Sequence, residues 1–314
     1  MKAIVYERYG SPDILELRDV EKPSVTDDGV LVRIRAASTN PYDWHFMRGK
    51  PLFTRLMFGL FRPKDHRLGA DLAGEVEAVG KDVTRFRPGD SAFGEGAGAF
   101  AEYACVPERW LARKPTNLTF EQAAAVPMAA NTALQGLRDG GRIQAGQKVL
   151  IHGASGGVGT FAVQIAKSFG AEVTGVCSTK NVEMVKKIGA DHVVDYTRDD
   201  FTRGETRYDL MLDTIGDRSL RACRRVLAQK AVYVFIGGRM SHLASTMLAR
   251  PFVSQDVKAV VAKRSSADLE FLAGLIEAGK VAPVIDRTYP LSEVPAAIRY
   301  LEGGHARGKI VITV

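Results

Sequence analysis

The spacing of hydrophobic positions changes along the chain, and the change predicts two kinds of structure. Up to about residue 120, short β-branched runs such as 2–7, 29–38 and 73–80 are separated by Gly, Asp and Pro turn residues, which indicates strands. From about residue 121, strand and helix patterns alternate, as in the strand 148–152 followed by the helix 157–169. Such alternation predicts βαβ units and a parallel sheet.

These patterns predict an α/β protein with a doubly wound, Rossmann-type parallel sheet and a second, mostly β domain. We place the mostly β domain at residues 1–121 and the parallel-sheet domain at 122–264. The tail 265–314 returns to mixed strands and helices, and we expect it to complete the first domain.

A glycine-rich turn, "GASGGVG" at 153–159, joins a buried-strand pattern to an amphipathic helix. A turn of this kind directs unpaired backbone N–H groups and the positive end of the helix at one point, where a pyrophosphate fits. Gly156 would let the phosphates approach the backbone, and Gly159 would let the helix pack on the strand. The predicted cofactor contacts in this turn are Ala154, Ser155, Gly156, Gly157, Val158 and Gly159.

The same letters also fit the GxxxGxG turn of short-chain dehydrogenases, with glycines at 153, 157 and 159. Those enzymes transfer protons with a Tyr-x-x-x-Lys pair. None of the nine tyrosines has Lys four residues later, and the turn lies near the middle of the chain. The short-chain alternative is therefore excluded.

The next predicted strand ends in "STKN", and this ending indicates which dinucleotide binds. Sites that prefer NAD place an acidic residue on the ribose hydroxyl about 20 residues after the glycines. Here Ser178 stands at that point and Lys180 follows, and a hydroxyl with a cation suits a 2′-phosphate. We therefore predict NADPH as the cofactor. An ordinary exposed lysine is the alternative for Lys180.

Composition and charge narrow the classes of partner. The net charge of +7 is compatible with acidic ligands, but the densest basic run, 218–225, lacks interleaved aromatic residues, so we expect no nucleic acid. The three cysteines are far apart, which excludes a disulfide framework and a four-cysteine zinc site. The first strand pattern begins at once after Met1, without a signal-peptide pattern, so we expect a cytoplasmic protein.

Together, several motifs resemble the medium-chain dehydrogenase/reductase superfamily, in its zinc-independent quinone oxidoreductase-like branch. They cover 69–90, 98–107, 123–137, 153–159, 189–196 and 304–314. The resemblance implies a GroES-like catalytic domain beside the Rossmann domain. It also implies a homodimer formed by edge-to-edge pairing of sheets, for which 256–263 is the candidate edge strand.

The positions that carry zinc ligands in other members of the superfamily are changed here. Asn40 stands where a Cys would fall, and Gly69-Ala70-Asp71 replaces Gly-His-Glu. Catalytic zinc needs three ligands of the His, Cys or carboxylate type, so we predict no metal. Without a Lewis acid, the acceptor must already be electron-poor, which favours a small apolar quinone or a conjugated enone. The alternatives are a 2-alkenal or enoyl reductase of the same fold and a nucleotide-binding protein with little catalysis.

The resemblance also implies further site residues. Asn40 would donate a hydrogen bond to the developing oxyanion, and His45 would supply a proton or a hydrogen bond. For Asn40 the alternative is a role in a turn. For His45 the alternative is a position that does not touch the substrate. The remaining predicted cofactor contacts are Thr132, Tyr196, Gly237, Gly238 and Lys309. The alternative for Lys309 is a charge on the protein surface, and for the other four it is an ordinary structural role.

Two apolar stretches, 51–64 and 241–252, depart from a minimal quinone reductase. We expect them to cover the active cleft and to favour bulky apolar acceptors. A peripheral membrane contact and plain core packing are the alternatives.

Overall fold

The computed structural model describes residues 1–52, 55–56, 59–237 and 254–314 of the chain. It forms two compact units. Unit 1 comprises Met1–Ala129, Arg264–Glu277 and Pro283–Val314, and unit 2 comprises Ala130–Lys263 and Ala278–Ala282. The domain boundaries predicted from the sequence, at 121/122 and 264/265, stay a prediction.

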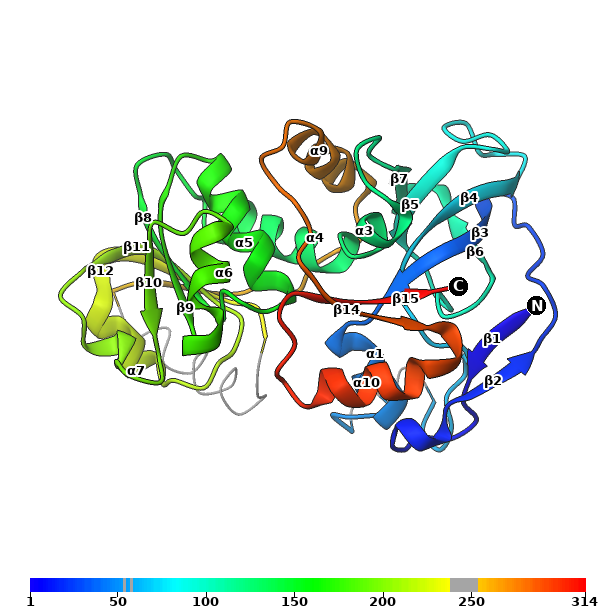
Figure 1. The fold of residues 1–314 in the computed structure, drawn as a ribbon, viewed down its shortest axis with the longest axis horizontal. Helices are drawn as coiled ribbons and strands as arrows, with labels where there is room; N and C mark the ends of the chain where they lie inside the picture. Colours follow the sequence, from blue (N-terminus) through cyan, green and yellow to red (C-terminus); the bar gives the residue numbers. More distant parts are fainter. Residues whose placement is uncertain (53–54, 57–58, 238–253) are drawn as a thin grey trace. The chain divides into compact units, whose positions relative to one another are not determined.

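Unit 1 is built on a seven-stranded sheet with the order β14-β15-β3-β4-β5-β7, in which β6 also pairs with β3 (Figure 1). The strands β1 and β2 form a separate antiparallel pair. In β3, nearly every side chain is buried, because neighbouring elements cover both of its faces. The strands are β1 (Lys2–Val5), β2 (Glu16–Asp19), β3 (Gly29–Ser38), β4 (Asp71–Val79), β5 (Ser91–Glu95), β6 (Tyr103–Pro107), β7 (Leu111–Arg113), β14 (Ile285–Pro290) and β15 (Lys309–Thr313).

The helices of unit 1 begin at the caps and prolines of the sequence. α1 (Pro41–Arg48) has a capping box between Asn40 and Asp43, and α3 (Phe120–Ala124) has one between Thr119 and Gln122. Pro127 opens α4 (Pro127–Gln135), which continues into unit 2. α9 (Ser266–Glu277) contacts β7, and α10 (Val294–Glu302) packs against α1, where Arg48 pairs with Glu302.

Unit 2 contains a six-stranded, all-parallel sheet with the order β10-β9-β8-β11-β12-β13 (Figure 1). This order is that of a doubly wound Rossmann sheet, so the predicted fold class is confirmed. The strand order reverses direction between β8 and β11, the switch point where ligands bind in such sheets. The strands are β8 (Lys148–His152), β9 (Glu172–Cys177), β10 (His192–Asp195), β11 (Tyr208–Asp213), β12 (Leu227–Phe235) and β13 (Asp256–Ala259).

Helices follow the first, second and fourth strands of this sheet. They are α5 (Gly157–Ser168), α6 (Val182–Lys187) and α7 (Leu220–Cys223). α7 is only four residues long, because it gives way to a 3-10 turn and β12 begins at Leu227 to pair with β11. β13 is an edge of the sheet among the described strands, but it is shorter than the predicted strand 256–263.

Each unit has its own hydrophobic core. In unit 1, Val32 and Ile34 of β3 pack with Leu72 and Phe100, all almost fully buried. In unit 2, Tyr233 of β12 is enclosed by the core of the parallel sheet. Within the described ranges, no helix is both long enough and apolar enough to cross a membrane.

Candidate nucleotide site and a buried polar network

The predicted glycine turn lies between β8 and α5 and has the shape of a phosphate cradle. Gly153 adopts φ of +87°, a conformation that favours glycine. A Cβ on Gly159 would lie 2.0 Å from the Gly153 carbonyl oxygen, so helix and turn are in close contact. A Cβ on Gly156 would meet nothing nearer than that same oxygen at 3.5 Å. The backbone at Gly156 is therefore open to a ligand, while Gly159 is closed by packing.

The residues around Gly156 present backbone N–H groups. Gly156 is the N-cap of α5, so the first N–H groups of this 12-residue helix have no acceptor within the helix. Such groups, together with the helix dipole, favour an anion. Ala154 is buried and its N–H donates to the Val176 carbonyl, whereas Ser155 and Val158 are partly exposed. The turn thus fits a pyrophosphate.

The end of β9 is joined to this turn by a residue that the sequence analysis did not name. Asn181 Nδ2 donates to Ser155 Oγ at 3.0 Å and to Ser178 Oγ at 3.3 Å. Lys180 is exposed, as the alternative interpretation also expects, and Tyr196 is 51% exposed. The structure therefore brings Ser155 and Ser178 together and leaves Lys180 and Tyr196 accessible.

The remaining predicted cofactor residues of unit 2 lie on other elements. Thr132 is buried in α4, and Gly237 follows β12. A Cβ on Gly237 would lie 3.3 Å from the carbonyl oxygen of Thr214, which follows β11. Gly238 lies outside the described residues, as does the whole of the predicted stretch 241–252.

A second polar cluster joins the carboxyl ends of β8 and β11. His152 Nδ1 lies 2.9 Å from Asp213 Oδ1, and Tyr233 donates to Asp213 Oδ2 at 2.6 Å. Burial alone would raise the pKa of Asp213, but these hydrogen bonds and that from the Gly216 N–H lower it below its ordinary value. The loop after β11 is held at this edge, because Asp213 Oδ1 accepts the Ile215 and Gly216 N–H groups and Thr214 Oγ1 donates to the His152 carbonyl.

In unit 1, Asn40 and Lys309 belong to one buried network. Lys309 is only 3% exposed, so the surface position that was its alternative interpretation is wrong. Its Nζ donates to Asn40 Oδ1 at 2.5 Å, to Asp71 Oδ2 at 3.2 Å and to the Thr39 carbonyl at 3.1 Å. Asn40 Nδ2 and Ser38 Oγ also donate to Asp71 Oδ2, each at 2.9 Å. Both ends of the Asn40 amide are thus hydrogen-bonded within the protein.

Asp43 lies beside this network and is fully buried. Its Oδ2 accepts the Asn40 backbone N–H at 2.7 Å. Burial raises the pKa of Asp43 to about 8, so the carboxyl is mostly protonated at neutral pH. A neutral Asp43 leaves Asp71 as the carboxylate that balances the Lys309 ammonium.

His45 lies on α1 with its ring stacked on Trp44, at 3.7 Å between centroids. Its Nδ1 is 3.0 Å from the Lys50 carbonyl oxygen, so this nitrogen donates and leaves Nε2 as an acceptor. Burial lowers the pKa of His45. A neutral ring of this kind favours accepting a hydrogen bond over supplying a proton.

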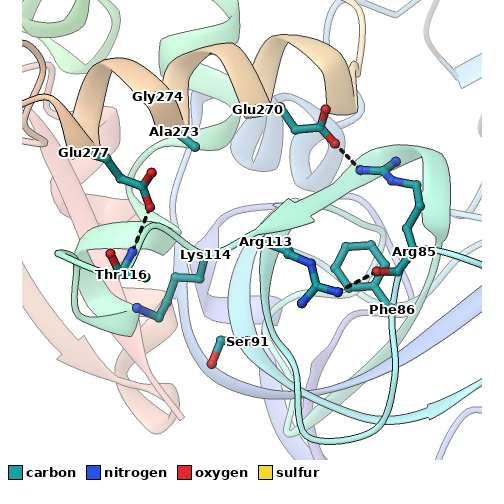
Figure 2. Close-up of a pocket in the computed structure, with 10 residues that line it drawn as sticks. All are labelled: Arg85, Phe86, Ser91, Arg113, Lys114, Thr116, Glu270, Ala273, Gly274 and Glu277. Carbon is teal, nitrogen blue, oxygen red and sulfur yellow. Dashed lines mark hydrogen bonds and ion pairs between the residues drawn. The ribbon is translucent and has the colours of Figure 1, made fainter.

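Unit 1 also contains a cavity of about 720 Å³ between α9 and the strands β5 and β7 (Figure 2). None of the predicted site residues lines it. Its basic side chains are engaged, since Arg85 pairs with Glu270, Arg113 pairs with Asp90, and Lys114 donates to two backbone carbonyls. Across the described part of the chain, no group of three or more His, Cys, Asp or Glu residues could hold a metal ion.

Comparisons with known proteins agree with this architecture. A family model described as alcohol dehydrogenase GroES-like domain matches residues 26–116, and one described as zinc-binding dehydrogenase matches 188–312. The chain is 36% identical to a tomato (Solanum lycopersicum) 2-methylene-furan-3-one reductase, over 99% of this chain and 79% of the relative. The chain belongs to the medium-chain dehydrogenase/reductase superfamily, in its quinone oxidoreductase-like branch.

Two further relatives support the same placement. An Arabidopsis thaliana chloroplastic protein named NADPH-dependent alkenal/one oxidoreductase is 35% identical, over 99% of this chain and 79% of its own. The solved quinone oxidoreductase from Coxiella burnetii has a TM-score of 0.90 and 31% identity, and covers 100% of this chain and 99% of its own. For a medium-chain reductase, the open Gly156, the start of α5 and the paired serines form a set of donors that fits a dinucleotide.

Proposed function

We propose that this medium-chain reductase transfers hydride from NADPH to a quinone or another electron-poor conjugated acceptor. The observation that carries the proposal is the glycine turn, open at Gly156, with Ser155 and Ser178 held together beside it and no carboxylate at the end of β9. The names of the relatives support both the cofactor and the class of acceptor.

When bound, NADPH supplies the hydride, and the protein's residues bind and orient it. We assign the pyrophosphate to the backbone from Ala154 to Gly159 and the 2′-phosphate to Ser178, Lys180 and Tyr196. Thr132, Gly237 and Gly238 are the proposed contacts at the nicotinamide end. Lys309 is the remaining predicted cofactor contact. We propose that only its backbone makes this contact, because its ammonium is enclosed by Asn40, Asp71 and Thr39.

We also propose that the reaction needs no zinc. Asn40 and Asp71 stand at positions that the family resemblance assigns to the zinc site, and both are hydrogen-bonded to the Lys309 ammonium. This ammonium would repel a divalent cation at the same point. With no metal to polarise an oxygen, the acceptor must be electron-poor, and the buried Asn40 and the partly exposed His45 are its proposed contacts in unit 1.

The oligomeric state and the location of the protein are proposals of the same kind. We propose a homodimer through β13, which is an edge strand of the described sheet. We propose the cytoplasm as its location, although several relatives are chloroplastic or mitochondrial.

Oxidation of NADPH and NADH, followed side by side with quinones, conjugated enones and saturated ketones, tests the function. We expect turnover with the first two classes, at least tenfold higher kcat/KM with NADPH than with NADH, and no turnover of saturated ketones. Product analysis separates quinone reduction from the alkenal or enoyl alternative, because only the latter saturates a carbon–carbon double bond. Tight NADPH binding without turnover would support the non-catalytic alternative, and one tightly bound zinc per chain would overturn zinc independence.

A further inference from the structure

Asn181 connects two segments that both face the proposed adenosine end of the cofactor. It is 5% exposed, and its side chain does not cap α6, although it stands at the N-cap position. Its Nδ2 instead donates to Ser155 in the glycine turn and to Ser178 after β9. An amide buried in this way fixes the two hydroxyls relative to each other.

The direction of these hydrogen bonds determines what the serines can do. Each serine oxygen accepts a hydrogen from Asn181, so its own hydroxyl hydrogen is directed to another acceptor. Both serines are partly exposed, so that acceptor can be a ligand. Two hydroxyl donors held by the same amide nitrogen suit a phosphate.

We propose that Asn181 is a positioning residue that selects 2′-phosphorylated nucleotides by holding Ser155 and Ser178 as donors. This inference rests on the NADPH site of the proposed function and adds a residue that determines its specificity. Asn181 acts through the serines and is not itself placed on the phosphate.

The surrounding charges are consistent with an anionic ligand at this point. Asp195, at the end of β10, accepts hydrogen bonds from Thr179 at 2.6 Å and from Thr197 at 2.7 Å, and it lies 3.7 Å from Arg198. Its charge is therefore compensated locally. Lys180 adds an exposed cation next to Asn181.

The arrangement also differs from that of a purely structural asparagine. Among the described residues, Asn181 Oδ1 is buried without a hydrogen-bond partner. Leaving a buried acceptor unsatisfied is unfavourable. The amide keeps this orientation although its oxygen is unpaired, and its Nδ2 donates to the hydroxyls of both serines. This indicates that the orientation is maintained for the hydrogen bonds to the serines.

Binding of 2′,5′-ADP and 5′-AMP, measured by isothermal titration calorimetry on the full chain, tests the inference without relying on turnover. We expect Asn181→Ala to weaken 2′,5′-ADP binding by about tenfold, as for the loss of hydrogen bonds to a charged group, and 5′-AMP binding by less than about threefold. Asn181→Asp should weaken 2′,5′-ADP binding more, by about 100-fold, because a carboxylate would accept the serine hydrogens and repel the phosphate. Asn117→Ala, which removes a side chain bonded to the Ile276 carbonyl in unit 1, is the matched control and should leave both affinities unchanged.

A double-mutant cycle separates positioning from general structure. In a Ser155→Ala/Ser178→Ala background, Asn181→Ala should cause no further loss of 2′,5′-ADP affinity. An undiminished loss in that background, an equal loss for both ligands, or no loss at all would overturn the inference. Asn181→Asp keeps the side-chain shape and serves if the alanine variant fails to fold. If the wild-type chain binds 2′,5′-ADP and 5′-AMP equally well, the NADPH assignment fails together with the inference. The other contrary outcomes overturn only the role of Asn181 and leave the NADPH assignment intact.

Discussion

At the scale of single residues, Lys309 and Asp71 form a buried ion pair in unit 1. Both side chains are buried, and removing one partner leaves the other as an uncompensated charge. We therefore expect Lys309→Met to lower the free energy of unfolding by about 3–5 kcal/mol. Urea unfolding followed by fluorescence measures the change.

The double variant Lys309→Met/Asp71→Asn provides the control for that prediction. Because the double variant removes both charges, its loss of stability should be smaller than the summed losses of the single variants Lys309→Met and Asp71→Asn. Strictly additive losses would show that the pair is not coupled in the folded protein.

The burial of Asp43 determines the direction in which this residue makes the stability of the protein depend on pH. Its folded pKa of about 8 exceeds the unfolded value of about 3.9. Between these values the folded state holds a proton that the unfolded state releases, so this contribution to stability is present at low pH and is lost as pH rises towards 8. The slope reaches at most about 1.4 kcal/mol per pH unit.

Asp43→Asn, which keeps the shape of the neutral carboxyl, isolates this contribution. The variant should gain stability relative to wild type as pH rises from 5 to 9, measured by urea unfolding at each pH. A constant difference across this range would contradict a raised pKa, because other titrating groups cancel between the two proteins.

At the scale of elements, Gly159 determines how α5 meets the turn after β8. A Cβ there would lie 2.0 Å from one backbone atom and 2.8 Å from another, and backbone cannot give way as a side chain can. Gly159→Ala should therefore lower the free energy of unfolding by about 1–3 kcal/mol and weaken NADPH binding. Thermal unfolding and fluorescence titration with NADPH measure the two effects.

Gly274 in α9 is the matched control for this substitution. An added Cβ meets nothing within 4 Å there. Gly274→Ala should stabilise the protein by about 0.5–1 kcal/mol, the ordinary gain of alanine over glycine inside a helix. Equal effects of the two substitutions would mean that Gly159 is not held by packing.

The elements that could be predicted from sequence are those whose signals are local. The glycine turn, the strand before it and the helix after it lie within about 20 consecutive residues, and the alternating pattern then predicts the parallel sheet. Asn181, Asp213 and the burial of Lys309 could not be predicted in the same way. Their partners lie 26, 61 and 269 residues away in the chain, so only the folded structure brings them together. A polar residue at the end of a parallel strand, like Asp213, or a few positions after one, like Asn181, is the signal that could have drawn attention to both.

At the scale of the whole molecule, the two units should respond differently to a ligand that carries only the adenosine end of the cofactor. Every residue assigned to that end, from Ala154 to Tyr196, belongs to unit 2. Binding stabilises the state that binds, by about 2.7 kcal/mol when the ligand is at 100 times its Kd. We therefore expect saturating 2′,5′-ADP to slow hydrogen exchange in peptides from 148–196, while peptides from the β3–β4 sheet of unit 1 exchange as before. Hydrogen–deuterium exchange mass spectrometry measures both sets in one experiment, with 5′-AMP at the same concentration as the control. Protection of equal size in both units, or protection by 5′-AMP equal to that by 2′,5′-ADP, would contradict a phosphate site confined to the carboxyl ends of β8 and β9.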